Sequence, residues 1–327
     1  MASLLSPYRV LSPAGPAAKL DILIFHRVYP ARDPLASTEP DVARFDRLMG
    51  FLRRGFNVLP LGEAVTRLRD GTLPPAAACV TFDDGYADNL TLALPVLARH
   101  EIPATIFVAP GYLDGGRMWN DTVIESVRGA ATAELDLTDV GLPRLAVGSL
   151  DEKRAAIATL LPLLKYRPLD ERTRLADVIG ARVRAQLPRN LMLTTDQLRG
   201  LAADPRITIG AHTRLHPILA SSMNESAETE IRGSRQDLES TLQCPVDLFA
   251  YPNGRPDQDY RACHVAMVRA AGFRAAVSTA QGVATASSDP FQLPRFTPWG
   301  QSMLKFSLQL ARMLAGRPSS VALAEAV

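Results

Sequence analysis

The chain has 327 residues, with 36 basic and 34 acidic side chains and a formal net charge of +2. This balance gives no indication of a nucleic-acid partner or a membrane surface, because proteins that bind either usually carry an excess of positive charge. Hydrophobic residues make up 47% and charged residues 21%, which is the composition of a globular protein. The length suits one large α/β domain or two ordinary ones.

The cysteines and the N-terminal segment bear on the cellular compartment. Cys79, Cys244 and Cys263 are an odd number without the spacing of a metal site or a disulfide framework, which fits reduced thiols. Residues 1–20 contain only short apolar runs, so no signal-peptide core is recognised. No segment approaches the ~18 apolar residues of a membrane span. The sequence therefore predicts a soluble cytoplasmic protein, and it leaves the oligomeric state open.

Strand and helix patterns alternate along the first third of the chain. Short apolar runs predict strands at 21–25, 57–59, 76–80 and 104–108. Amphipathic segments predict helices at 42–54, 61–70 and 89–100. This alternation is typical of a parallel sheet covered by helices.

The segment 112–195 departs from that rhythm. It is dense in charged residues, has few strand signals, and predicts helices at 121–128, 150–164 and 170–185, so we expect a helical insertion. After it, with Thr195 as a helix cap, strands are expected at 207–210, 248–251, 275–278 and 291–296. Helices are expected at 196–203, 224–243, 257–271 and 301–315. The resulting division is an N-terminal extension (1–20), one large domain (21–315) and a loose tail (316–327).

Two adjacent carboxylates lie where a buried strand is expected to end. The run 76–80 leads into the sequence TFDDG at 81–85. Asp and Gly favour turns, so Asp83 and Asp84 are expected at the start of a loop. Neighbouring carboxylates repel each other, and a metal cation would relieve that repulsion. The alternative is a simple turn with two solvated charges.

A second expected strand end carries two histidines. His212 and His216 follow the run 207–210, and Pro217 disfavours a helix, so both are expected in a loop. Neutral imidazoles and one carboxylate make a good three-ligand metal site with open positions for water or substrate. A lone histidine is usually structural, but a pair at this spacing, with a carboxylate pair elsewhere, indicates metal ligands.

Five segments in this order resemble a known family. They are ILIFHRV at 22–28, TFDDG at 81–85, HTRLHP at 212–217, FAYPNG at 249–254 and LPRF at 293–296. Together they are similar to the motifs of the polysaccharide deacetylases (carbohydrate esterase family 4, the chitooligosaccharide deacetylase superfamily). The resemblance covers roughly residues 20–300. It implies an α/β fold, a distorted (β/α)7 barrel, with the site at the carboxyl ends of the strands as in other parallel barrels.

The spacing and the resemblance together imply roles for the strand-end residues. Asp84, His212 and His216 are expected to bind one divalent metal ion, and zinc is the expected metal. Asp83 is expected to act as the general base. The family usually has an arginine where this chain has Ala250, and that arginine steadies the base. Arg295 could take its place as a charge-assisted partner of Asp83, or form an ordinary surface salt bridge.

The general acid and the substrate contacts are less directly indicated. The family commonly supplies the acid from a histidine in a Leu-x-His motif, and no histidine follows His264 here. His26 is the candidate instead, because some exopolysaccharide deacetylases carry a similar histidine after an N-terminal strand; it could equally pack under the loop 30–40. Tyr251, Asn253 and Trp119 are candidate substrate or oxyanion contacts, although Tyr251 and Trp119 could simply pack.

The resemblance therefore implies a metal-dependent hydrolase that removes N-acetyl groups from the amino sugars of an oligo- or polysaccharide and releases acetate. Two alternatives stay open. One is the same site acting on O-acetyl esters or on a small cyclic amide. The other is a glycan-binding relative without turnover.

Overall fold

Seven parallel strands form a nearly closed barrel. The computed structural model describes residues 7–183, 186–298 and 302–316. In spatial order the strands are β1 (Leu20–Phe25), β3 (Ala77–Phe82), β4 (Ala104–Val108), β7 (Ile207–Ala211), β8 (Leu248–Ala250), β9 (Ala275–Gln281) and β10 (Leu293–Arg295). Each pairs with its neighbour in parallel, and β2 (Asn57–Val58) adds to β3 outside this path. The predicted strands and the distorted (β/α)7 barrel are confirmed.

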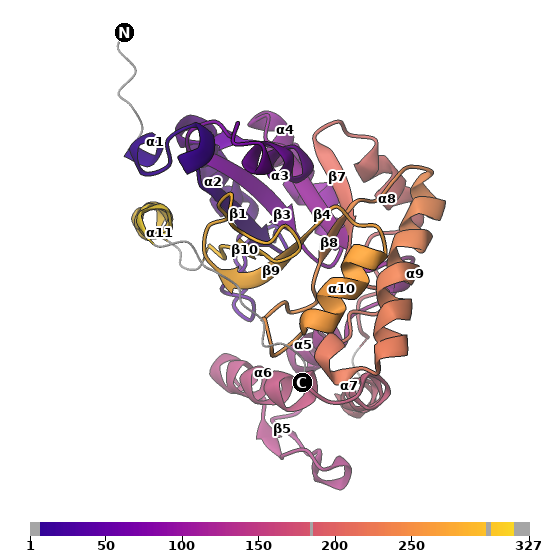
Figure 1. The fold of residues 1–327 in the computed structure, drawn as a ribbon. Coiled ribbons are helices and arrows are strands. Elements are labelled where there is room, and N and C mark those ends of the chain that lie inside the picture. Colours follow the sequence, from indigo (N-terminus) through magenta and orange to yellow (C-terminus); the bar gives the residue numbers. More distant parts are fainter. Residues whose placement is uncertain (1–6, 184–185, 299–301, 317–327) are drawn as a thin grey trace.

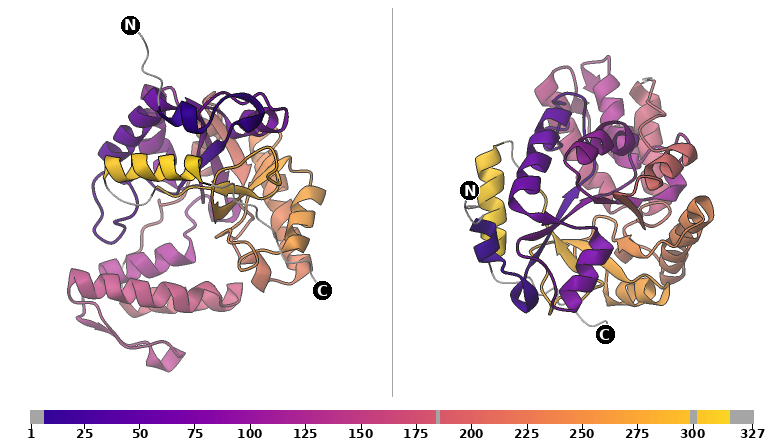
Figure 2. Two further views of the ribbon diagram at one scale, coloured as in Figure 1. Left: turned by 60° about the vertical axis from the view of Figure 1, so that its left-hand side comes forward. Right: turned by 90° about the horizontal axis from the view of Figure 1, so that it is seen from above.

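The barrel closes between its first and last strands. Phe296, directly after β10, donates from its N–H to the oxygen of Ile22 at 2.7 Å. The N–H of Ile24 donates to the oxygen of Phe296 at 3.0 Å. Figure 2 shows the strands as a ring when the molecule is seen from above. The barrel thereby brings to one face the carboxyl ends of strands that lie far apart in the sequence.

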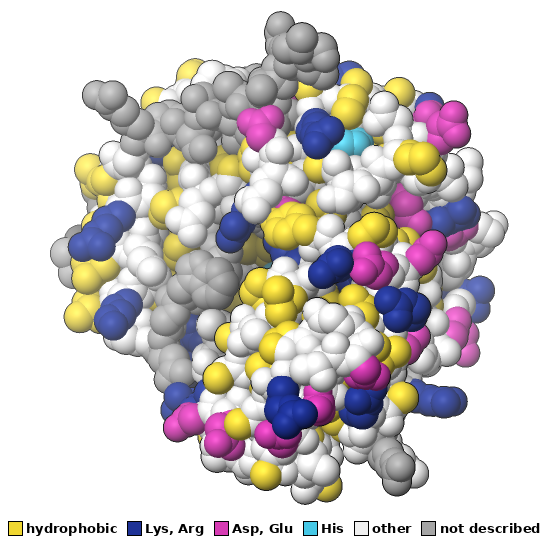
Figure 3. Space-filling model, turned by 90° about the horizontal axis from the view of Figure 1, so that it is seen from below, with side chains coloured by type: hydrophobic (Ala, Val, Ile, Leu, Met, Phe, Trp, Pro, Cys, Tyr) yellow, Lys and Arg dark blue, Asp and Glu magenta, His cyan; other side chains and the backbone are white. Residues whose placement is uncertain are grey.

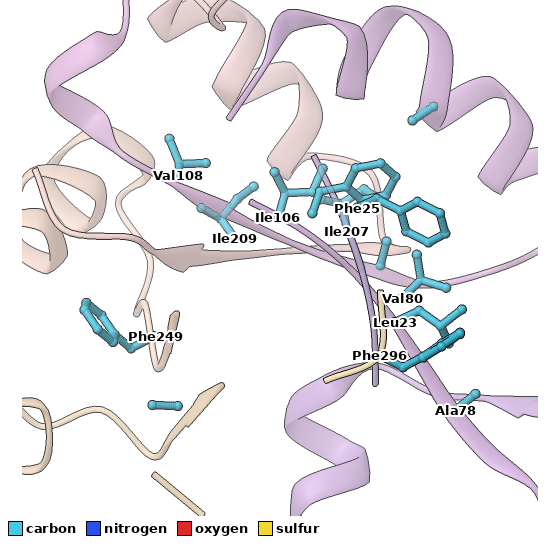
Figure 4. Packing of buried hydrophobic residues seen from close by; sticks show 14 of the residues in the cluster. Leu23, Phe25, Ala78, Val80, Ile106, Val108, Ile207, Ile209, Phe249 and Phe296 are labelled. Atoms are coloured by element: carbon cyan, nitrogen blue, oxygen red, sulfur yellow. The ribbon is translucent and has the colours of Figure 1, made fainter. Parts of the chain in front are cut away.

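Helices pack around the outside of the barrel because the outward residues of the strands are apolar. They include α2 (Val42–Gly55), α3 (Leu61–Arg69), α4 (Leu94–Arg99), α8 (Thr195–Ala202), α9 (Asn224–Leu242) and α10 (Ala262–Ala270). Phe25, Val80, Ile106 and Ile209 belong to one buried cluster together with Phe45 of α2. Figure 4 shows this packing from close by. Burial of such side chains stabilises the fold by roughly 1.5–3 kcal/mol each.

Two predicted helices begin their α-helical part five residues later than expected, at Leu94 and at Ala262. The segment 89–100 starts with a π-helical turn at Asn89–Ala93, and Pro95 then lies at the start of α4, where a missing N–H costs little. The helix expected at 257–271 begins only at Ala262, because the N–H of Arg255 donates to the carboxylate of Asp259 at 3.0 Å and holds a turn there.

The insertion 112–195 is helical and lies below the carboxyl ends of the strands in Figures 1 and 2. Its helices are α5 (Trp119–Gly129), α6 (Leu150–Lys165) and α7 (Leu169–Val183). Two short strands, β5 (Glu134–Leu135) and β6 (Leu145–Ala146), pair with each other and not with the barrel sheet. The helices share a hydrophobic cluster of their own, which includes Val127, Leu160 and Ile179. The insertion thus has its own core.

The two ends of the described chain meet on one side of the barrel. α1 (Pro7–Leu11) packs against α11 (Met303–Ala315), and the hydroxyl groups of Tyr8 and Ser307 are 2.6 Å apart. Residues 1–6 of the predicted extension and 317–327 of the predicted tail lie outside the described residues. Among the helices in the described ranges, none has both the length and the hydropathy to cross a bilayer.

Candidate metal centre and substrate cleft

Tight turns at two strand ends place the metal-ligand candidates. Asp84 and Gly85 follow β3 with φ of 79° and 86°, in the left-handed region where residues with a Cβ are strained. A Cβ on Gly85 would lie only 2.9 Å from Cγ1 of Val108 on β4, so this position requires glycine. In the loop after β7, His216 also has a positive φ, 51°. Strain of this kind is often found at functional sites.

Asp84, His212 and His216 converge on one point. Oδ1 of Asp84 is 3.4 Å from Nε2 of His212 and 3.5 Å from Nε2 of His216. One ligand atom from each of the three residues lies within 4.8 Å of the others. The two imidazole rings have centroids 4.7 Å apart. Three N and O donors converging in this way match the ligand set of a divalent cation such as zinc.

The protonation states of these side chains fit a metal ion. Nδ1 of His212 lies 2.7 Å from the backbone oxygen of Ala250, which can only accept, so the neutral ring keeps a lone pair on Nε2. Burial lowers the pKa of His216 to about 3, so this ring is neutral at pH 7. Burial opposes the ionisation of Asp84, but the neighbouring rings of His212, His216 and His26 hold its pKa below the ordinary value.

Asp83 forms a buried ion pair with Arg295. Nη1 and Nη2 of Arg295 donate to the two carboxylate oxygens of Asp83, each at 2.7 Å. Nε of Arg295 donates to the backbone oxygen of Ser278 at 2.8 Å, which fixes the guanidinium plane. Both side chains are buried. Burial tends to raise the pKa of Asp83, but Arg295, His212 and His26 together lower it more, so the pKa lies below the ordinary value. Asp83 is therefore held as an oriented carboxylate.

A cleft of about 800 Å³ opens above these residues, between the barrel face and the insertion. His26, which follows β1, lines it together with Asp83, Asp84 and both candidate ligand histidines. The side chain of His26 is 40% exposed, and its Nδ1 is 3.9 Å from Oε1 of Glu39. Burial lowers the pKa of His26, but the carboxylates of Asp84 and Glu39 raise it more, so the net pKa is raised. His26 is thus placed to hold a proton inside the cleft.

The three proposed substrate contacts differ in position. Trp119 and Asn253 line the cleft. The N–H of Asn253 donates to no atom of the described residues, so it faces no competing acceptor there. Tyr251 does not line the cleft and is fully buried, with its ring stacked on Tyr260 at 3.9 Å. The structure therefore does not bring Tyr251 to the cleft with the other two residues, because inward packing after β8 turns the ring into the core.

Two contacts that sequence reasoning missed tie the insertion to the site. Nη2 of Arg172, on α7, donates to the backbone oxygen of His216 at 3.1 Å, and its guanidinium lies over the ring of Trp119. The hydroxyl of Tyr86, just after the Asp84 turn, donates to the carboxylate of Asp121 on α5 at 2.9 Å. The two residues of each pair lie far apart in the sequence. Only information on long-range contacts could therefore have predicted these two hydrogen bonds.

Solved structures with the same fold belong to deacetylases. The chain is similar to the deacetylase PplD of Streptococcus pyogenes, with a TM-score of 0.61 and 19% identity over 90% of this chain and 98% of that one. It is similar to IcaB of Ammonifex degensii, with a TM-score of 0.60 and 19% identity over 93% and 99% of the two chains. At these identities the likeness shows the fold.

Sequence comparison identifies the family. The YxkH protein of Bacillus subtilis is 36% identical over 94 residues, which span 28% of this chain and 32% of that relative. The family described as "Polysaccharide deacetylase" matches residues 70–131 and 174–276, together half of the chain. The matched ranges contain Asp83, Asp84 and both histidines of the candidate metal centre. The chain belongs to the polysaccharide deacetylase family.

Proposed function

We propose that this protein is a metal-dependent hydrolase that removes N-acetyl groups from the amino sugars of a glycan and releases acetate. The observation that carries the proposal is the convergence of Asp84, His212 and His216 beside the Asp83–Arg295 ion pair, inside one cleft. Membership of the deacetylase family supports a glycan substrate. The structure of PplD is described as a complex with acetate, the product expected here.

Asp84, His212 and His216 would hold the cation, and the donor set favours zinc. When bound, a divalent cation supplies Lewis-acid activation of an acyl carbonyl and of water. The Nδ1–H of His212 donates to Ala250, which keeps the ring oriented for this purpose.

Asp83 is the general base in this proposal. Its carboxylate accepts the proton of the attacking water, and Arg295 keeps it ionised and oriented throughout. The free N–H of Asn253 is a candidate donor to the oxygen that becomes negative as the acyl carbon turns tetrahedral.

His26 is the general acid in this proposal. An amine anion is a very poor leaving group, so amide hydrolysis needs a proton on the departing nitrogen. His26 lies in the cleft, and the carboxylates near it raise its pKa, which favours the protonated ring that an acid requires. This favours N-acetyl groups over the second candidate, O-acetyl esters, whose leaving groups depend less on an acid.

The test is acetate release from a panel of acetylated glycans. The panel contains N-acetylglucosamine oligomers, an acidic N-acetylated polysaccharide, and an O-acetylated xylan oligomer of similar length. Each is assayed with protein stripped by a chelator and with protein reloaded with zinc. We expect acetate from N-acetylated glycans only, and only after reloading. If only the O-acetylated oligomer releases acetate, the protein is an esterase and not an N-deacetylase. If the stripped protein is as active as the reloaded protein, the reaction does not depend on a metal.

A further inference from the structure

One wall of the cleft carries two cations and one carboxylate. Lys165 is the last residue of α6, and Arg255 lies in the loop after β8, so they come from the insertion and from the barrel. Both line the 800 Å³ cleft that also contains the candidate metal centre. Arg255 is close enough to lower the pKa of Lys165, which burial lowers first.

A buried carboxylate contacts the ammonium group of Lys165 and the backbone of Arg255, while the side chain of Arg255 is exposed. Asp259 has no exposed surface, and its Oδ1 lies 3.8 Å from Nζ of Lys165. The same oxygen accepts the hydroxyl of Tyr166 at 3.1 Å, and Oδ2 accepts the N–H of Arg255 at 3.0 Å. Gln258 donates its side-chain amide to the hydroxyl of Tyr166 at 2.6 Å. Three of these contacts end on the carboxylate of Asp259, and together the four contacts join the end of α6 to the loop after β8.

The positive charge of this wall is not neutralised by the protein. Asp259 offers one negative charge to two cations. The guanidinium of Arg255 forms no ion pair with a carboxylate anywhere in 7–183, 186–298 or 302–316. The acids that line the cleft are Asp83, which is paired with Arg295, and Asp84, which faces the two histidines.

The excess charge is local. On the face shown in Figure 3, basic and acidic side chains are interspersed, in keeping with the net charge of +2. This face therefore has no general affinity for polyanions. Two cations that line one cleft, together with the candidate site for an amino sugar, favour an anionic group at that position.

We propose that Lys165 and Arg255 form a subsite for an acidic sugar, binding the carboxylate of a uronic acid next to the N-acetylated residue. The inference rests on the proposed glycan deacetylation and narrows its substrate class to acidic glycans. The guanidinium of Arg255 offers paired donors that match a carboxylate, and Lys165 adds a point charge. The side-chain amide of Gln258, which also lines the cleft, is a polar neighbour for the same sugar.

The experiment compares an acidic substrate with its uncharged methyl ester. One is an oligosaccharide of alternating N-acetylglucosamine and glucuronic acid, and the other is its methyl ester. For wild-type protein loaded with zinc, we expect kcat/KM for acetate release to favour the acid by about tenfold or more. In Arg255→Gln and Lys165→Gln the acid-to-ester ratio should fall toward one. Arg9→Gln, on α1 at the opposite end of the molecule in Figure 1, should keep the wild-type ratio.

Each acid-to-ester ratio is measured on one protein preparation. A partly misfolded variant loses activity on both substrates equally, so misfolding does not change the ratio. A wild-type ratio near one would overturn the subsite, and so would unchanged ratios in both cleft variants. A preference for O-sulfated over unsulfated N-acetylglucosamine oligomers, without a preference for the uronate, would overturn the carboxylate assignment.

Calorimetric binding of the same acid and ester separates this proposal from the proposed function. If neither substrate releases acetate but the acid binds about tenfold more tightly, and Arg255→Gln removes that difference, the subsite stands and deacetylation fails. Equal binding of acid and ester overturns the subsite whatever the activity.

Discussion

Arg172 of α7 donates a hydrogen bond from Nη2 to the backbone oxygen of His216 at 3.1 Å. The donor belongs to the insertion and the acceptor to the candidate metal centre, and Arg172 is fully buried. The bond restrains a loop residue whose φ is 51°. We expect Arg172→Gln to weaken zinc binding by about tenfold or more, the usual effect of removing a residue that supports a metal ligand. Competition with a chromogenic chelator measures the affinity.

Arg174→Gln is the matched control, because Arg174 is exposed on the same helix. It should keep the wild-type zinc affinity. If Arg172→Gln folds, as judged by circular dichroism, and binds zinc as tightly as wild type, Arg172 does not position His216.

The metal content of single variants should distinguish the three candidate ligands from the candidate base. We expect wild-type protein to bind about one zinc ion, and Asp84→Ala, His212→Ala and His216→Ala each to lose most of it, because three protein donors complete a zinc site. Asp83→Asn should retain the metal and lose about 10²-fold or more in turnover, the scale of general-base removal. Elemental analysis and acetate release measure the two properties. Full zinc content in both histidine variants would remove them from the ligand set.

The Asp83–Arg295 pair should set the acidic limb of the pH–rate profile. Burial raises the pKa of Asp83, but Arg295 and the nearby histidines together lower it more, so the base stays ionised until the pH falls through that lowered pKa. In Arg295→Gln this pKa rises, and kcat/KM should begin to fall at a higher pH than in wild type. Arg274→Gln, which removes an exposed arginine paired with Asp247, should leave the profile unchanged.

The same pair predicts a coupled effect on stability. Arg295→Gln leaves a buried carboxylate without its partner and should cost about 3–5 kcal/mol in the free energy of unfolding. Adding Asp83→Asn to that variant should recover part of the loss, because the unpaired charge is gone. Urea unfolding of the four proteins completes the cycle. Additive losses would mean that the two side chains do not stabilise each other.

His26 should matter for amides more than for activated esters. We expect His26→Ala to reduce acetate release from N-acetylglucosamine oligomers by about 10²-fold or more. Hydrolysis of p-nitrophenyl acetate should fall far less, because nitrophenolate leaves without a proton. His100→Ala is the matched control, since His100 pairs with Asp46 on the helical surface at 3.0 Å and does not line the cleft. Equal losses on both substrates, or loss of metal, would give His26 another role.

Asp21 should make stability fall as the pH rises. Among the described residues, neither carboxylate oxygen of Asp21 has a hydrogen-bond partner, and burial raises its pKa from 3.8 to about 7. Between these values the folded protein keeps a proton that the unfolded chain releases, so stability is lost across this window as pH increases. Asp21→Asn cannot ionise. It should match wild type near pH 4 and exceed it by roughly 1–4 kcal/mol at pH 8.

Urea unfolding at both pH values measures the difference. The control is Asp177→Asn, an exposed position on α7. If the free energies of unfolding of wild type and Asp21→Asn change in parallel between pH 4 and pH 8, Asp21 is ionised in the folded protein over this range.

The barrel and the centre of the site could be predicted because each depends on local sequence. Asp83 and His212 follow apolar runs directly, and a parallel barrel brings the ends of such runs to one face. The pattern could not place Tyr251, since a residue just after a strand faces either the cleft or the core, and only packing against Tyr260 decides.

Other features were outside the reach of sequence because they join distant segments. The Arg172–His216 bond and the Asp259 network each connect the insertion to a barrel loop. Even a local detail depended on such a contact. Thr195 was expected to cap α8, but Thr194 does so, and the hydroxyl of Thr195 donates instead to Asp114 at 2.6 Å.

The closure of the barrel by Phe296 has a consequence for biosynthesis. A nascent chain exposes all three candidate ligands and Asp83 long before residues 293–296 leave the ribosome. Until then the edge of β1 beyond Leu20, which pairs with Ala284, lacks its partner, and such an edge is a hazard for aggregation during translation. The segment that removes this hazard also carries Arg295, the partner of Asp83. A chain that ends before residue 293 would therefore lack both the segment that closes the barrel and the proposed partner of Asp83, and we expect it to be inactive.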